Sequence, residues 1–380
     1  MFKNLFHTLR RPLRTTTRSV PAQRLSPARP GDVAITPRTI SGADLSAAAF
    51  VGLAAQGPLG TAVAISSPAE YAQTFGDHGP GHLGPATRAF FANGGQRLYI
   101  VRVAAMPTDT VATQAALASL DGLHDLGLLA LPGESTPAIL QAAARYCEQR
   151  RQVLLLADGP ALATVNAATS LAATLHSSHM ALYFPWLHTL PDAVAIPPSG
   201  AMAGLHARQA QTGQIWKAVA GTTVGVADVT ALHTTYDESA LASLVQANIN
   251  PIRAHAGRFV VWGSRTLSTD PEFRYVQVRR FYSYVEASIA RGLDWLTHAA
   301  NTPTTWAAVR QSCADFLDAQ WRAGALQGEK PDAAYFVRCD RSSMTQSDLD
   351  QGRLIVELGI AVQKPAEFLV LLVAHATADA

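Results

Sequence analysis

The sequence predicts an α/β middle region, then an α+β C-terminal domain, with extended segments at both ends. Two observations support this fold class. Between residues 126 and 184, short uninterrupted apolar runs alternate with helical stretches, which is typical of a parallel sheet covered on both faces. Beyond residue 250 this alternation stops, and two long amphipathic patterns precede several β-prone runs.

The first elements of the middle region are short. We expect strands in three apolar runs, at 47–53, 63–65 and 97–103. A helix begins after Ser67, which can cap it, because Pro68 suits the first helical position and Glu70 the third. A Gly/His/Pro-rich loop at 76–85 and a helix at 86–92 follow.

The alternating part and the C-terminal domain follow in order. For the middle we predict strands at 126–131, 153–157 and 180–184 and helices at 137–150 and 161–175, then a loop-rich stretch at 190–213. For the C-terminal part we predict strands at 258–262, 275–278, 334–338, 354–362 and 367–374 and amphipathic helices at 280–296 and 305–322.

Composition excludes several classes of protein. Apolar residues make up 48% of the 380 residues and charged residues only 15%, which argues against a largely disordered chain. Seven of the 30 basic residues lie in the first 30, which hold no acid, so the remaining residues carry 23 basic and 28 acidic groups, a net charge of −5. That body is not a nucleic-acid-binding surface. The longest apolar run, 368–374, is too short to span a membrane.

Composition shifts suggest five regions: a basic tail at 1–30, an N-terminal arm at 31–45, the α/β region at 46–250, a C-terminal domain at 251–366 and a terminal strand or arm at 367–380. We expect the tail to be disordered, and an electrostatic tether is the alternative.

Motifs for catalysis or metal binding are weak. Residues 79–84 match G-x-G-x-x-G, but they follow a predicted helix instead of a strand, which favours a tight loop. Asp348 and Asp350 resemble a fragment of a calcium loop, yet Thr345 with Asp348 fits helix capping better. The three cysteines are widely spaced, which indicates buried free thiols. We therefore predict no enzyme, no cofactor and no metal site.

A cluster of basic residues stands between 253 and 280: Arg253, Arg258, Arg265, Arg274, Arg279 and Arg280. Two interpretations stay open. The cluster could form an oxyanion or phosphate site, or its members could form ion pairs within or between subunits with Asp270, Glu272 and Glu286.

Several stretches of the sequence are distinctive in combination: Ile249–Arg253, Trp262–Ser268, Asp270–Tyr275, the pair Arg279-Arg280, Cys339–Gln346, Asp348–Leu354 and Lys364–Phe368. In this order they resemble one family, the tail sheath proteins of contractile phage tails and contractile injection systems. The resemblance extends from about residue 30 to the C-terminus. The family usually begins near Pro30, so the basic tail looks like an addition.

The resemblance implies a structural subunit that polymerises with itself around an inner tube and contracts to drive the tube through a target envelope. It also implies a subtilisin-like α/β region without a catalytic site. The expected partners are other copies, the inner tube protein and the baseplate and terminal cap proteins, with no nucleic acid and no membrane insertion. Such particles assemble in the bacterial cytoplasm and act as a phage tail or a released injection particle.

Extended terminal segments are the candidate contacts between subunits, because a strand can be added to a neighbour's sheet. In the N-terminal arm the candidates are Val33, Ile35 and Ile40, and in the C-terminal arm they are Phe368, Val370 and Leu372. The alternative for 367–376 is an ordinary core strand. We expect deletion of 1–42 or 367–380 to abolish tubular assembly but leave a folded monomer.

Helix 305–322 is the candidate contact with an acidic inner tube, through Arg310 and Arg322. Two other functions stay open at this point. The alternating middle region also suits an α/β hydrolase-like enzyme, and a non-contractile oligomeric scaffold would share the apolar, weakly charged body.

Overall fold

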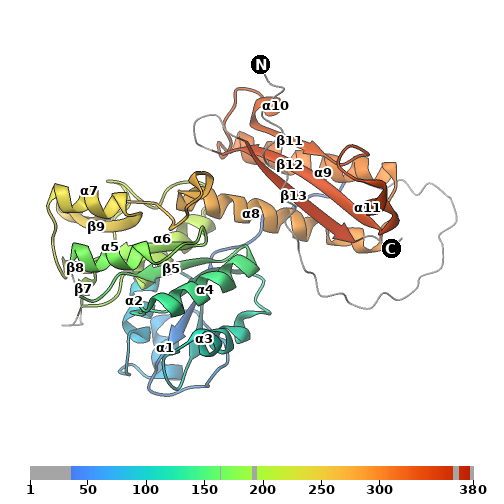
Figure 1. Cartoon of the computed structure of the whole chain (residues 1–380). Helices are drawn as coiled ribbons and strands as arrows, with labels where there is room; N and C mark the ends of the chain where they lie inside the picture. Colours follow the sequence, from blue (N-terminus) through green and yellow to red (C-terminus); the bar gives the residue numbers. More distant parts are fainter. Residues whose placement is uncertain (1–35, 163, 191–194, 363–367, 377–380) are drawn as a thin grey trace.

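Figure 1 shows two units of different build, joined by one long helix. The computed structural model describes residues 36–162, 164–190 and 195–362, and the backbone of 368–376. The predicted tail at 1–30 lies outside the described residues, and so do Val33 and Ile35 of the predicted arm.

The larger unit is built on an eight-stranded sheet in the order β10-β9-β6-β5-β4-β1-β3-β2. Its strands are β1 (Ala47–Gly52), β2 (Val63–Ile65), β3 (Leu98–Arg102), β4 (Leu126–Ala130), β5 (Leu154–Asp158), β6 (Met180–Phe184), β9 (Ile249–His255) and β10 (Arg258–Val261). The six central strands are parallel, and the edge strands β2 and β10 are antiparallel to their neighbours. The predicted parallel sheet is confirmed.

Helices cover both faces of this sheet. One face packs against α1 (Pro68–Phe75), α2 (Leu83–Ala92) and α6 (Ser199–Gln211), and the other against α3 (Thr110–Leu117), α4 (Pro137–Arg150), α5 (Val165–Ala173) and α7 (Glu238–Gln246). Every residue of β1, β4, β5 and β6 is buried. The continuous apolar runs in the sequence follow from this two-sided cover.

Helix α6 lies where the sequence indicated loop at 190–213. Its buried face is made mostly of small residues, so the usual stripe of large apolar side chains is absent. A Cβ on Gly200 or Gly204 would clash with the main-chain oxygen of Ala86 or Phe90, so the backbones of α6 and α2 approach closely. Segments before and after α6 pair to form a small two-stranded sheet, β7 (Leu187–Thr189) with β8 (Val229–Leu232).

The smaller unit is a three-stranded antiparallel sheet, β11-β12-β13, packed on α8 and α9. Its elements are α8 (Val276–Gly292), α9 (Pro303–Arg322), α10 (Pro331–Ala334), β11 (Tyr335–Arg338), α11 (Gln346–Asp350), β12 (Arg353–Ala361) and β13 (Phe368–Ala376). Short 3-10 helices stand at Ala118–Leu120, Pro271–Phe273 and Asp294–His298.

Two predictions about this unit need correction. The strand expected at 275–278 is the first turn of α8, because four residues are too few to separate a buried strand from a buried helical turn. The boundary predicted at 250/251 falls inside β9, which extends the large sheet by pairing with β6. The large sheet therefore includes residues up to Val261.

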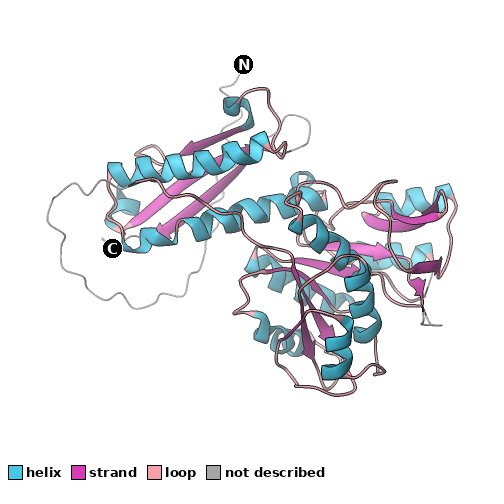
Figure 2. Cartoon of the chain, turned by 180° about the vertical axis from the view of Figure 1, so that it is seen from behind, coloured by secondary structure: helices cyan, strands magenta, loops and turns pink. Residues whose placement is uncertain are grey.

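Helix α8 belongs to both units. Val276, near its start, is part of the core of the larger unit, and Val285 and Ile289 are part of the core of the smaller one. Figure 2 shows the same helix from behind, extending from one unit to the other. A continuous helix shared by two cores favours a fixed orientation between the units.

Candidate functional site

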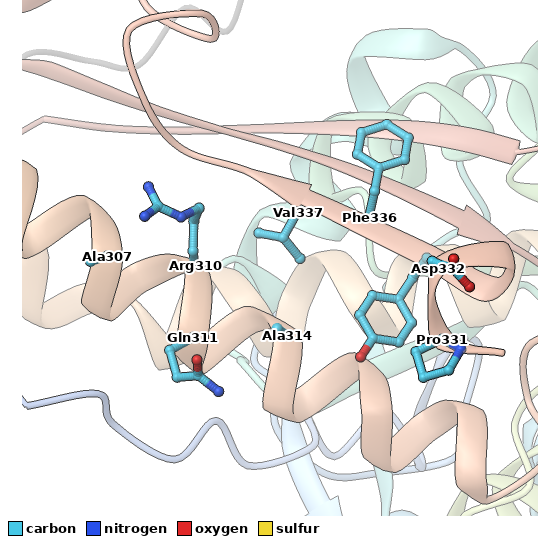
Figure 3. Close-up of a pocket in the computed structure, with 9 residues that line it drawn as sticks. Ala307, Arg310, Gln311, Ala314, Pro331, Asp332, Phe336 and Val337 are labelled. Atoms are coloured by element: carbon cyan, nitrogen blue, oxygen red, sulfur yellow. The ribbon is translucent and has the colours of Figure 1, made fainter.

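The open edge of the small sheet is the main candidate for an assembly site. Among the described residues, β11 pairs with β12 alone, so its other edge has no neighbouring strand. A groove of about 440 Å³ separates this edge from α9. It is lined by Ala307, Arg310, Gln311, Ala314, Pro331, Asp332, Tyr335, Phe336 and Val337 (Figure 3). An unpaired strand edge is a template for pairing with another chain.

Local sequence places β11 beside α9. Gly324 and Gly328, with φ of 81° and 119°, reverse the chain after α9, and the Trp321 indole Nε1 donates to the Gly328 carbonyl at 2.9 Å. Pro331 then begins the one-turn helix α10, which leads directly into β11. In Figure 3, Val337 projects toward α9 and Phe336 to the other side of the strand.

The two arginines predicted to face an inner tube have partners within the chain. Arg310 Nη1 donates to the Cys339 carbonyl at 2.6 Å, which ties α9 to the end of β11. Arg322 Nε lies 2.7 Å from Asp318 Oδ2. Asp315 is exposed on the same helix, so the outer surface of α9 carries charges of both signs.

The segment before β1 packs on the smaller unit. Ile40 is buried against Gly292 of α8, and Ala43 and Leu45 belong to the same core. Ile40, predicted to reach a neighbouring subunit, is thus a core residue of its own chain. The physical reason is that Gly292 has no side chain, which leaves room for Ile40 on the helix.

Two buried serines hold this segment by its main chain. The Arg38 N–H donates to Ser312 Oγ on α9 at 2.8 Å, and the Ala43 N–H donates to Ser288 Oγ on α8 at 2.9 Å. Sequence reasoning missed both contacts. The signal that could have found them was a serine within an otherwise apolar helical stripe, which needs a hydrogen-bond partner when buried.

Arg280 connects the units through a buried polar chain. Its guanidinium donates to the His206 carbonyl at 3.0 Å and to the Leu45 carbonyl at 3.2 Å. The His206 ring accepts from Arg280 through Nδ1 at 3.3 Å, so its Nε2 faces Tyr183 Oη, 2.9 Å away, as a donor. Burial lowers the pKa of Arg280 to about 10, so it stays charged at neutral pH.

Arg279 is also buried, between aromatic rings. Its Cζ lies 4.5 Å from the Phe273 ring centre and 4.6 Å from that of Tyr282. Burial lowers its pKa to about 10. Arg279 and Arg280 therefore lie inside the fold, where a phosphate could not reach them.

The other members of the arginine cluster lie near the surface. Arg253 binds Glu238 through two bonds of 2.6 and 3.1 Å. Arg265 donates to the Val245 carbonyl at 2.8 Å, and Arg274 is exposed. Among the acids, Asp270 caps the 3-10 helix by accepting from the Glu272 N–H at 2.9 Å, and Glu286 pairs with Arg151. The structure does not bring these arginines together into one site.

The C-terminal strand forms a ladder with its own chain. β13 pairs with β12 over nine residue pairs, among them Ala361 with Phe368, Gly359 with Val370 and Glu357 with Leu372. For 367–376 the sequence allowed either an arm or an ordinary core strand, and this pairing corresponds to the core strand. The side chains of β13 lie outside the described residues.

Among the described residues, no Ser/His/Asp triad forms at the carboxyl ends of the parallel strands. Asp158, at the end of β5, accepts from Ser199 Oγ and Ser199 N–H, both at 2.7 Å, and from the Gly133 N–H at 2.9 Å. Ser199 is fully buried, so its hydroxyl is not accessible, and it donates to the carboxylate instead of to a histidine. The cluster caps the start of α6.

Other functional signals are weak in the described part of the chain. It holds no group of three or more side chains placed to bind a metal. None of its helices combines the length and apolar character that a membrane span needs. Cys147, Cys313 and Cys339 are free and buried, as predicted.

Two family models match the sequence. The model for the phage tail sheath protein central domain matches residues 109–267, and the model for the phage tail sheath C-terminal domain matches residues 268–375. A comparison with curated proteins found no match.

Solved structures with the same fold come from contractile systems. The sheath of PVC, an extracellular contractile injection system, in its contracted state has 29% identity and a TM-score of 0.75, over 94% of this chain and 98% of that chain. The contracted helical sheath of the anti-feeding prophage has 28% identity and a TM-score of 0.74, over 93% and 99%. A chain of the anti-feeding prophage baseplate structure has 29% identity and a TM-score of 0.74, over 93% and 98%.

Proposed function

The chain belongs to the phage tail sheath family, and we propose that it is the structural subunit of a contractile sheath in a phage tail-like injection particle. The observation that supports this function is a similarity of 28–29% identity over 93–94% of the chain to two sheaths solved in the contracted state. In this function, copies of the chain polymerise as stacked rings around an inner tube. Contraction drives the tube through a target envelope.

We propose that the open edge of β11 receives an extended segment of a neighbouring subunit. The groove beside it is lined on α9 by the small side chains of Ala307 and Ala314, which leave space for side chains of an added strand. The predicted arm at 31–45 is described from residue 36 on, and its Arg38 N–H donates to Ser312 Oγ on α9 of the smaller unit at 2.8 Å. Val33 and Ile35 alternate, as one buried face of an added strand requires.

For the C-terminal arm we propose exchange of β13 between subunits. The nine pairs that β13 makes with β12 could form equally with the β12 of a neighbour, because strand exchange preserves every ladder bond. Main-chain bonds of this kind would link subunits and still leave their relative rotation free.

Contraction is then a rigid-body rotation of subunits about these terminal connections. The buried contacts of Arg280 and the shared helix α8 support a subunit that moves as one body. A gain of about 1–2 kcal/mol per subunit, which is the scale of one or two net hydrogen bonds, would add up over many subunits to far more than thermal energy.

The proposed partners are other copies, the inner tube, the baseplate and a terminal cap. We propose that α9 contacts the inner tube through Arg310 and Arg322. Asp315 and Asp318 on the same helix partly offset the positive charge of these arginines. A baseplate contact is supported by the similar chain in the anti-feeding prophage baseplate. We place assembly in the bacterial cytoplasm, before release of the particle.

We further propose that the larger unit is a subtilisin-like α/β domain that has no peptidase chemistry. Its parallel sheet with helices on both faces suits that fold, and the Ser199 hydroxyl beside Asp158 is too buried to act as a nucleophile. The domain boundary lies between the last strand of the large sheet at Val261 and the start of α8.

Negative-stain microscopy of the purified full chain tests the function. Wide hollow tubes are expected, and failure to form tubes even with the particle's tube and baseplate proteins co-expressed would contradict a sheath.

To test the arm, residues 1–35 are deleted. The structure shifts this cut from residue 42, because Ile40 and Ala43 belong to the core.

Deletion of 1–35 should leave a folded monomer with an unchanged melting temperature and no tubes. Deletion of 1–30 is the matched control, since it removes the basic tail and keeps Val33 and Ile35, and it should still form tubes. Normal tubes from both variants would rule out the N-terminal arm.

A further inference from the structure

Opposite edges of the large sheet carry exposed apolar side chains. In the described part of the chain, five large apolar side chains are exposed: Leu59, Val111, Leu162, Leu190 and Trp262. Trp262 directly follows β10 at one edge of the sheet. Leu59 forms a β-bridge with Arg102 at the end of β3, the strand next to the other edge, and Val111 lies in the first turn of α3, the helix that follows β3 in the chain. Figure 1 shows α7 and β9 at one end of this unit and α1 and α3 at the other.

Trp262 is exposed yet held in place. It is 38% exposed, and its main-chain N–H donates to the Pro251 carbonyl at 2.7 Å. Arg253 Cζ lies 4.7 Å from the centre of its ring, and Glu238 fixes Arg253 by two hydrogen bonds. Binding would therefore cost little side-chain entropy. Immobilised Trp beside Arg is the composition typical of interface hot spots.

The two edges differ in exposed charge. Arg258 is exposed at the start of β10, at the opposite end of that strand from Trp262, and Arg253 beside Trp262 is paired with Glu238. Beside Val111, Asp109 is exposed as the cap of α3. Arg102 at that edge turns inward and donates to the carbonyls of Ala54 and Gly57, at 3.1 and 2.7 Å. One edge thus presents the exposed guanidinium of Arg258 and the other the exposed carboxylate of Asp109, which suits a contact between them.

We propose that the Trp262 edge (Arg253, Arg258 and Trp262) of one subunit docks onto the Val111 edge (Leu59, Asp109 and Val111) of a second copy. Because the two surfaces differ, the contact is heterologous, and repeating it generates a ring or a helix instead of a closed dimer. The inference rests on the proposed sheath function, which supplies the neighbouring copies. It adds a contact between the large units to the strand exchange of the small ones.

Cysteine cross-linking of assembled sheaths tests the contact. Ala254→Cys and Thr108→Cys place one exposed thiol on each edge, and the chain's own cysteines are buried. With a bifunctional maleimide, tubes of the double variant should give a ladder of covalent multimers, and each single variant should stay monomeric on a denaturing gel. Intact tubes without a ladder would overturn the contact and leave the sheath function standing. Dimers from a single variant would overturn its heterologous character.

Side-chain substitutions provide a second measurement. Trp262→Ala should raise the critical concentration for tube formation about tenfold or more. Arg258→Glu and Asp109→Arg should each weaken assembly, and the two together should restore it. Wild-type critical concentrations for Trp262→Ala, with no rescue in the double charge variant, would overturn the proposal. If the full chain formed no tubes under any condition, the sheath function itself would fall.

Discussion

The two sheets of this protein differ in how their edges end. In the large sheet, the outer edge of β10 is covered by the segment 221–226, through bonds of 2.8 Å from Gly221 N–H to the Val261 carbonyl and from Val226 N–H to the Phe259 carbonyl. Its other edge strand, β2, has only three residues. In the small sheet, β11 ends at an open edge beside the groove of α9.

Closed and open edges serve different purposes. Covered or very short edge strands prevent unwanted pairing, whereas an open edge beside a groove allows it. We infer that the core of the large sheet supplies most of the stability, and that the small sheet supplies strand pairing between subunits in addition to the side-chain contact proposed for the large units. Substitutions should separate these two properties. Their expected effect on the unfolding free energy of the monomer is largest in the core of the large sheet and smallest beside β11.

Phe50→Ala should be the most destabilising. Phe50 is fully buried in β1 and meets Phe90 edge-on, with 5.8 Å between ring centres. Loss of the ring should lower the unfolding free energy by about 3–5 kcal/mol, measured by urea denaturation. Leu59→Ala, at an exposed apolar residue of the same unit, is the control and should change it by less than about 0.5 kcal/mol. If Phe50→Ala and Leu59→Ala lowered the unfolding free energy equally, the core of the large sheet would not be the main source of stability.

Arg280→Leu should loosen the junction between the units. It leaves the buried carbonyls of Leu45 and His206 without their donor, at an expected cost of about 2–4 kcal/mol. Limited proteolysis should then cut residues 36–46 faster than in the wild type. An unchanged cleavage rate would show that Arg280 does not hold this segment.

Asp158→Asn should alter the pH dependence of stability. Burial raises the pKa of Asp158 to about 7, against about 4 in an unfolded chain. The folded protein therefore binds the extra proton between these values, and the stability that this provides is lost as pH rises from about 4 to about 7. Asparagine cannot titrate. Between about pH 4 and about pH 7 the unfolding free energy of the wild type should therefore fall by on the order of 1–4 kcal/mol relative to that of the variant. Parallel pH profiles from urea denaturation would contradict this.

Ala314→Trp should have the smallest effect on the monomer and a large effect on assembly. It fills the groove beside β11 at a partly exposed position, so the unfolding free energy should change by less than about 1 kcal/mol. Ala319→Trp is the matched control, on the same helix but outside the groove. Microscopy should show tubes for Ala319→Trp only. Tubes from both would place the assembly site elsewhere.

The sequence predicted much of the fold because local signals suffice for it. Continuous apolar runs indicated the parallel strands, and Ser67 caps α1 as expected, by accepting from the Glu70 N–H at 3.2 Å. The capping box of Thr345 and Asp348 is likewise confirmed. Helix α6 escaped prediction because glycine and alanine, not large side chains, form its contact with α2.

The candidate site was harder to predict. Ile40 seemed part of a free arm, because nothing near it in the sequence shows that Gly292 will accommodate it. Arginines 253 to 280 seemed to be one cluster, yet two of them are buried at the junction and the others separate at the surface.

By itself the sequence determined most strands of the parallel sheet and the long amphipathic helices, the absence of a recognisable catalytic motif and the resemblance to the sheath family, since each depends on residues close together in the chain. Only the tertiary structure decided which groups are partners and which edges stay open. Arg280 and the Leu45 carbonyl are separated by 235 residues, and β11 and β13 lie on opposite sides of β12. Contacts of this kind depend on how distant segments pack, and no local pattern records them.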